Sequence, residues 1–147
     1  MDFEPFELQH TAKIRVKYAD TDQMGHVYNG RYFEYFEVGR TELMRHNGLP
    51  YTVFESRDYL LPLVETGARF ISPAFYDDML EVEARVMVER RPLVRFEYNI
   101  FRGDSTIAKG YTVHSFMKRD SRKPVKPPQF YFDAVSEFNK SKQGEKP

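Results

Sequence analysis

The fold is decided by residues 30–46, GRYFEYFEVGRTELMRH. Apolar residues recur there at helical spacing and form a broad stripe that includes Tyr32, Phe36 and Leu43, while most charged residues lie off it. An Asn-Gly pair and a nearby proline, within residues 47–50, predict the end of this helix. Its aromatic content is too high for a helix lying loosely on a surface, so the sequence predicts that a sheet covers it.

Extended segments flank this helix on both sides. Before it, residues 11–18 alternate apolar with polar or charged side chains, which is the period of a half-buried strand. Four more extended runs follow an irregular stretch that ends at residue 57, and they span residues 59–72, 80–89, 94–100 and 106–118. In the first of these, Pro62 indicates a strand edge or start, and Gly67 indicates a bulge or a close backbone approach. The links between the runs are too short for parallel crossovers, so the strands are expected to pair antiparallel.

These elements predict an α+β domain in which about five antiparallel strands wrap around one long central helix. The whole of residues 1–138 is expected to form this single domain, with Asn29 as the N-cap of the central helix. Residues 119–128 are interpreted as an exit loop and residues 130–138 as a short helix. Residues 139–147 form a polar tail that is predicted to be disordered.

Composition excludes several classes of function. The chain has 147 residues, and 22 basic residues balance 22 acidic ones, so it lacks the basic field that nucleic-acid binding needs. It has no cysteine, which rules out disulfides and a thiol nucleophile, and its four histidines show no metal-ligand spacing. Neither a signal peptide nor a membrane span is visible, so a cytoplasmic protein that binds no membrane is expected.

The segment between the first strand and the helix carries the candidate chemistry. Asp20 and Asp22 follow the strand, and the chain then enters the helix at Asn29. The first N–H groups of a helix have no internal partner and can stabilise an oxyanion, while a carboxylate can attack a carbonyl or activate water. Together they suit acyl transfer. The alternative is that these side chains only form turn and capping hydrogen bonds, and the residue spacing alone favours this alternative. A calcium-binding loop is set aside because its later ligands are missing.

A wider set of residues resembles a known family. Residues 15–29, RVKYADTDQMGHVYN, together with the following Tyr32, Glu37 and Arg40, are similar to the 4-hydroxybenzoyl-CoA thioesterase-like hotdog family. The similarity covers residues 11–128 and includes the segments 72–80 and 122–128. The resemblance implies a hotdog fold and an enzyme that hydrolyses acyl-CoA thioesters without a cofactor.

The family also implies roles for individual residues. Asp22 would be the catalytic carboxylate, either attacking directly or activating water, and the N–H of Asn29 would polarise the thioester carbonyl. Asp20 is assigned to holding the loop. His26 is interpreted either as a group that orients Asp22 or water, or as a loop histidine bonded to backbone. His114 is interpreted as a packed or interface histidine.

The nucleotide end of CoA needs cationic partners. Arg90 and Arg91, at a strand end, are candidates for binding its phosphates, and the alternative is a pair of solvated charges at a hairpin tip. Hotdog proteins complete their acyl pocket with a second subunit, so Tyr35, Tyr59 and Glu65 are weaker candidates for facing a substrate there.

A single curled sheet leaves an outer face and free edges, which favours a homodimer or a dimer of dimers, that is, a homotetramer. Alternative functions are a non-catalytic acyl-CoA-binding hotdog module, an acyl-ACP thioesterase and a hotdog dehydratase.

Overall fold

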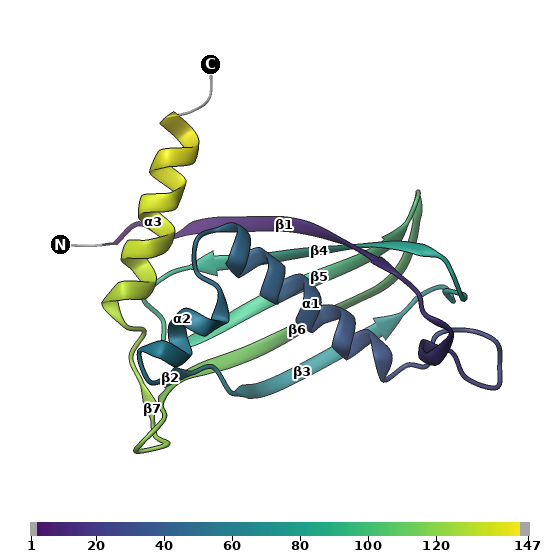
Figure 1. Ribbon diagram of the computed structural model, residues 1–147, viewed down its shortest axis with the longest axis horizontal. Helices are drawn as coiled ribbons and strands as arrows, with labels where there is room; N and C mark the ends of the chain where they lie inside the picture. Colours follow the sequence, from purple (N-terminus) through teal and green to yellow (C-terminus); the bar gives the residue numbers. More distant parts are fainter. Residues whose placement is uncertain (1–2, 145–147) are drawn as a thin grey trace.

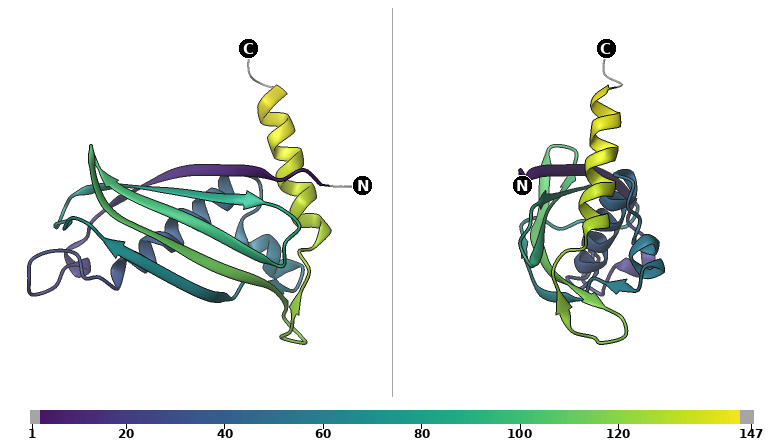
Figure 2. Two further views of the ribbon diagram at one scale, coloured as in Figure 1. Left: turned by 180° about the vertical axis from the view of Figure 1, so that it is seen from behind. Right: turned by 90° about the vertical axis from the view of Figure 1, so that its left-hand side faces the viewer.

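A computed structural model describes residues 3–144 and shows the central helix, α1, lying across a curled sheet (Figures 1 and 2). The elements in chain order are β1 (Phe6–Arg15), a 3₁₀ turn (Tyr18–Asp20), α1 (Arg31–His46), α2 (Tyr51–Ser56), β2 (Tyr59–Leu60), β3 (Leu63–Phe70), β4 (Met79–Val88), β5 (Leu93–Arg102), β6 (Ser105–Lys118), β7 (Pro124–Val125) and α3 (Gln129–Gly144). The terminal helix α3 stands at the end of the sheet where the chain begins (Figure 1).

The long strands lie side by side in the order β1-β4-β5-β6-β3, and every pair is antiparallel. The two-residue strands β2 and β7 pair with the last residues of β6. Five long antiparallel strands around a central helix are the predicted α+β arrangement, which is confirmed.

Alternation along the strands builds the core between α1 and the sheet. In β4, every second side chain from Leu80 to Val88 is buried, and the residues between them face outward. The helix approaches β4 closely at Gly39, where an added Cβ would lie 2.8 Å from Cγ1 of Val82. One turn earlier, the ring of Phe36 stacks on Tyr98 of β5 at 4.6 Å between centroids. Close helix–sheet contact thus depends on a residue without a side chain.

The predicted run of residues 59–72 is interrupted in the structure. Proline has no N–H to give to a ladder, and Pro62 lies between β2 and β3. The close approach at Gly67 is made by a side chain and not by backbone, because a Cβ there would lie 2.7 Å from the ring of Tyr111. The register irregularity of β3 lies elsewhere, between Leu63 and Glu65.

Other boundaries differ from the prediction. Strand β1 begins at Phe6, five residues early, because its pairing with β4 runs on to Val88. Helix α2 was not predicted. The N-cap of α1 is Gly30 rather than Asn29, and no side chain caps this end.

The last helix, α3, runs to Gly144, so residues 139–144 are helical where a disordered tail was predicted. Residues 145–147 of that predicted tail lie outside the described residues. No helix within the described part of the chain has the length and apolar character needed to cross a membrane.

Candidate active site

The loop between β1 and α1 folds into a tight turn that contains Asp22. Thr21 and Val27 form an isolated antiparallel bridge, and inside it the N–H of Asp22 donates to the carbonyl of His26 at 3.0 Å. The turn closes at Gly25, whose φ of 87° is a left-handed conformation that favours glycine. Local sequence therefore sets the shape of this loop.

Asp20 anchors the loop to α1. It is 3% exposed, and its Oδ2 accepts hydrogen bonds from the N–H of Lys17 at 3.0 Å and from the hydroxyl of Tyr35 at 2.9 Å. The guanidinium of Arg31 lies 3.9 Å from the other oxygen. A buried carboxylate with this many partners holds structure together, as predicted for Asp20.

Asp22 is half-buried, and its Oδ1 accepts a hydrogen bond from the N–H of Met24 at 2.9 Å. This bond is what the turn-capping alternative predicts. It occupies one oxygen, and a carboxylate has acceptor capacity for several partners. The geometry of this loop is therefore compatible with both interpretations of Asp22.

The start of α1 offers free backbone donors. The N–H groups of Arg31, Tyr32 and Phe33 donate to carbonyls of the preceding turn. Among the described residues, the N–H groups of Asn29 and Gly30 have no such acceptor. They are the groups at the positive end of the helix that remain available to a ligand.

A pocket of about 270 Å³ opens at this helix start. Its lining includes His26, Asn29 and Tyr32 from the loop and helix, and Phe70 and Ser72 from the end of β3. The structure thus brings two predicted site residues, His26 and Asn29, to one cavity. Asp22 belongs to the same turn but does not line the pocket. Phe70 and Ser72 were not predicted, because no local pattern marks a strand end as a pocket wall.

His26 is fixed by its neighbour. Its Nδ1 lies 3.2 Å from the carbonyl oxygen of Val27, which can only accept, so Nδ1 carries the proton of this bond. In a neutral ring Nε2 is then an acceptor. This bond is the one that the backbone-bonded interpretation of His26 predicts.

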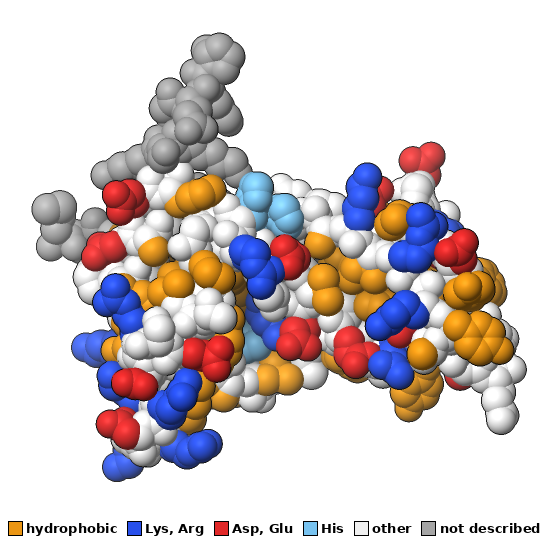
Figure 3. Space-filling view, viewed as in Figure 1, with side chains coloured by type: hydrophobic (Ala, Val, Ile, Leu, Met, Phe, Trp, Pro, Cys, Tyr) orange, Lys and Arg blue, Asp and Glu red, His pale blue; other side chains and the backbone are white. Residues whose placement is uncertain are grey.

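Exposed apolar side chains surround the same end of the molecule. Space filling shows hydrophobic atoms gathered there (Figure 3), and Tyr18, Met24, Tyr28 and Tyr76 are all more than half exposed. An exposed apolar group of this kind commonly marks a binding site.

Arg90 and Arg91 lie far from this loop within one chain. Val88, just before them, pairs with Phe6 at one end of β1, whereas the Asp22 loop leaves the other end after Arg15. Arg90 lies over the rings of Phe3 and Phe132, and Arg91 pairs with Glu89 at 2.6 Å. The structure does not bring this pair to the Asp22 loop, because ten residues of strand separate them.

The remaining candidates have structural partners. His114 is 3% exposed, so it is a packed histidine as predicted. The hydroxyl of Tyr35 is engaged by Asp20, the ring of Tyr59 packs on Phe130, and Glu65 accepts a hydrogen bond from Tyr111 at 2.7 Å.

Known proteins are similar to this chain in sequence. A family model described as the thioesterase-like superfamily matches residues 16–136. The acyl-CoA thioesterase YbgC of Haemophilus influenzae is 30% identical over 113 residues, which are 76% of this chain and 83% of that protein.

Solved structures of other proteins have a similar fold. A hypothetical protein, TT1821, from Thermus thermophilus superposes with a TM-score of 0.80 at 31% identity, covering 87% of this chain and 98% of that one. A 1,4-dihydroxy-2-naphthoyl-CoA thioesterase from Synechocystis reaches 0.79 at 25% identity, over 89% and 98% of the two chains. A 4-hydroxybenzoyl-CoA thioesterase complexed with 4-hydroxybenzoyl-CoA shares the fold, with a TM-score of 0.76 at 20% identity over 86% and 98%. With its curled sheet, central helix and matched sequence, the chain belongs to the thioesterase-like superfamily of hotdog-fold thioester hydrolases.

Proposed function

We propose that this protein hydrolyses acyl-CoA thioesters to a free acid and CoA, with the carboxylate of Asp22 as nucleophile or general base and the N–H of Asn29 polarising the thioester carbonyl. The observation that carries the proposal is that Asn29, whose N–H has no backbone acceptor among the described residues, lines a pocket beside the Asp22 turn. The acyl-CoA substrate is supported by the YbgC relative and by the structural neighbour that holds a CoA thioester.

Both chemical routes break the C–S bond and form a new C–O bond. As a base, Asp22 takes a proton from the attacking water, the carbonyl oxygen becomes an oxyanion that accepts from Asn29, and CoA leaves as a thiolate that is then protonated. As a nucleophile, Asp22 forms an acyl anhydride that water hydrolyses in a second step. Water supplies the added oxygen in either route.

A second subunit would complete the site. Within the described residues β3 pairs only with β6, so its other edge is free, and Leu63, Val64, Phe70 and Ile71 on and beside it are exposed. Two copies joined antiparallel through β3 would set the start of one strand against the end of the other. The end of β3 lines the Asn29 pocket, which would then face the partner. This pairing supports a homodimer, the unit from which a dimer of dimers would be built.

One observation favours a second candidate. Because Oδ1 of Asp22 is bonded within its own turn, a non-catalytic acyl-CoA-binding module is the alternative function. Such a module binds acyl-CoA saturably and releases no free CoA.

The test is Asp22→Asn, which keeps the size of the side chain and its bond to Met24. We expect hydrolysis of a panel of aliphatic and aromatic acyl-CoAs to slow on the order of 10²- to 10⁴-fold. Asp120→Asn is the matched control, since Asp120 also accepts a hydrogen bond within its own turn, from Ser121, beyond the end of β6. Unchanged turnover in Asp22→Asn would remove Asp22 from the mechanism, and no turnover by the unaltered protein would favour the binding module.

A further inference from the structure

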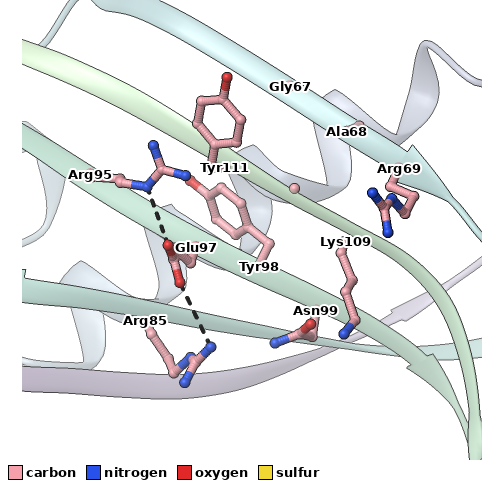
Figure 4. Close-up of a pocket in the computed structure, with 11 residues that line it drawn as sticks. Gly67, Ala68, Arg69, Arg85, Arg95, Glu97, Tyr98, Asn99, Lys109 and Tyr111 are labelled. Carbon is pink, nitrogen blue, oxygen red and sulfur yellow. Dashed lines mark hydrogen bonds and ion pairs between the residues drawn. The ribbon is translucent and has the colours of Figure 1, made fainter.

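The outer face of the sheet, turned away from α1, carries a hollow of about 590 Å³ (Figure 4). Its charged lining consists of four cationic side chains, Arg69, Arg85, Arg95 and Lys109, and one carboxylate, Glu97. The chain as a whole has a net charge of zero. Positive charge is therefore concentrated in this hollow, which is within the size range of small-molecule sites.

In one half of the hollow both arginines have acidic partners, since Glu97 is shared by Arg85 and Arg95 and Glu83 lies 3.7 Å from Arg85. Glu97 lies 3.2 Å from Arg95 and 3.8 Å from Arg85, and the guanidinium of Arg95 sits 4.1 Å above the ring of Tyr111. Figure 4 shows Glu97 joined to Arg95 on one side and to Arg85 on the other. Glu97 is thereby shared between two arginines and lies away from the other two cations.

The other half is not neutralised. Arg69 of β3 and Lys109 of β6 are direct register partners, so two like charges stand opposite each other on adjacent strands. Among the described residues, no carboxylate lies within 4 Å of either. Like charges directly opposite destabilise a sheet, and a bound anion would relieve that repulsion.

The side chains fit a phosphate better than a single carboxylate. The fork of Arg69 can hold two phosphate oxygens, and Lys109 adds a point charge. Asn99, the register partner of Lys109 on β5, places an amide in the same hollow. One guanidinium and one ammonium at a common site match a group that carries more than one negative charge.

The hollow lies behind the active-site end of β3. Arg69 directly precedes Phe70, which lines the Asn29 pocket, and successive residues of a strand point to opposite faces of a sheet. A ligand that passes the end of β3 would reach from one cavity to the other.

We propose that the hollow at Arg69 and Lys109 binds the phosphate groups of the nucleotide end of CoA. This inference rests on the proposed acyl-CoA hydrolysis. The phosphate site then lies at Arg69 and Lys109, which have no acidic partner in the described chain. It does not lie at the β4–β5 turn, where Arg90 and Arg91 have aromatic and acidic partners.

The double variant Arg69→Gln/Lys109→Gln tests it. We expect the KM for an acyl-CoA to rise on the order of 10-fold or more, with kcat little changed. The KM for the matching acyl-pantetheine, which has no nucleotide, should not move. Lys13→Gln, an outward-facing cation on β1 opposite Glu81, is the control and should leave both values unchanged. Thermal unfolding should be unaltered or shifted upward, since the variant removes a like-charge pair.

Two further arms decide the outcome. Titration calorimetry with 3′,5′-ADP on the unaltered protein should show binding that the double variant loses, and inorganic pyrophosphate alone should bind more weakly. If the double variant keeps the KM for acyl-CoA, or if Arg91→Gln raises it instead, the assignment is overturned while the hydrolytic function stands. If no acyl-CoA is hydrolysed at all, the proposed function fails. The loss or retention of 3′,5′-ADP binding in the double variant still tests whether the hollow binds phosphate.

Discussion

The hydroxyl of Tyr35 donates a hydrogen bond to Oδ2 of Asp20 across 2.9 Å, and both side chains are buried. Tyr35 lies in α1 and Asp20 in the loop that carries Asp22, so this bond ties the loop to the helix. Burial, and then the neighbouring carboxylate, raise the pKa of Tyr35 above its usual value, so the hydroxyl keeps its proton and remains a donor. The position of the loop that carries Asp22 thus depends on a contact between two residues fifteen apart in the chain.

Tyr35→Phe removes this donor without changing the shape of the ring. Asp20 would keep its backbone partner but lose a buried one, and we expect unfolding to become easier by about 1 to 3 kcal/mol. Denaturant titration measures this, with the exposed Tyr28→Phe as control. A variant as stable as the unaltered protein would show that the bond does not hold the loop.

Asn29 is expected to act through its backbone. Asn29→Ala retains the N–H and should change kcat only a few-fold, whereas Asn29→Pro has no N–H and should lose on the order of 10²-fold or more. Circular dichroism and thermal unfolding must show that the proline variant is folded. A large loss in Asn29→Ala would instead assign the function to the side-chain amide.

His114 should make stability depend on pH. Burial, and then the charge of Arg40, lower its folded pKa from 6.5 to about 4. Between these values the unfolded chain binds a proton that the folded chain does not, so acid favours unfolding. The stabilisation of the folded state by the neutral histidine is on the order of 1 to 3 kcal/mol. It is present above pH 6.5 and is lost as the pH falls toward 4.

The free energy of unfolding is measured for the unaltered protein and for His114→Gln across this pH range. The comparison separates the contribution of the histidine from that of the carboxylates. The difference in stability between the two proteins should shrink as the pH falls. A constant difference would mean that His114 titrates alike in both states.

The free edge of β3 gives a prediction about assembly. Val64→Lys places a charge on that edge and should convert an oligomer into monomers, because strand edges that carry lysine resist pairing. Sedimentation or light scattering measures the molecular mass of the assembly. Leu93→Lys, an equally exposed apolar site at the start of β5, should leave at least a dimer. A monomeric unaltered protein would contradict the shared site.

Regular alternation explains why most of the fold was predictable. Helix α1 was placed within one residue, and β4 to β6 were found within two. Buried and exposed positions alternate along β4 and along most of β5. The errors fall where periodicity is absent. Helix α2 spans only six residues, too few to show a helical period, and the cap at Gly30 involves no side chain that could mark it.

The sequence by itself determined the curled sheet, the central helix and the Asp22 turn, because each depends on local alternation, helical spacing or a glycine with positive φ. Only the tertiary structure decided which aspartate is buried, since the partner of Asp20 comes from the helix. It also separated Arg90 and Arg91 from the loop and set Arg69 opposite Lys109. Strand register fixes those neighbours, and register is determined by pairing between segments distant in the chain.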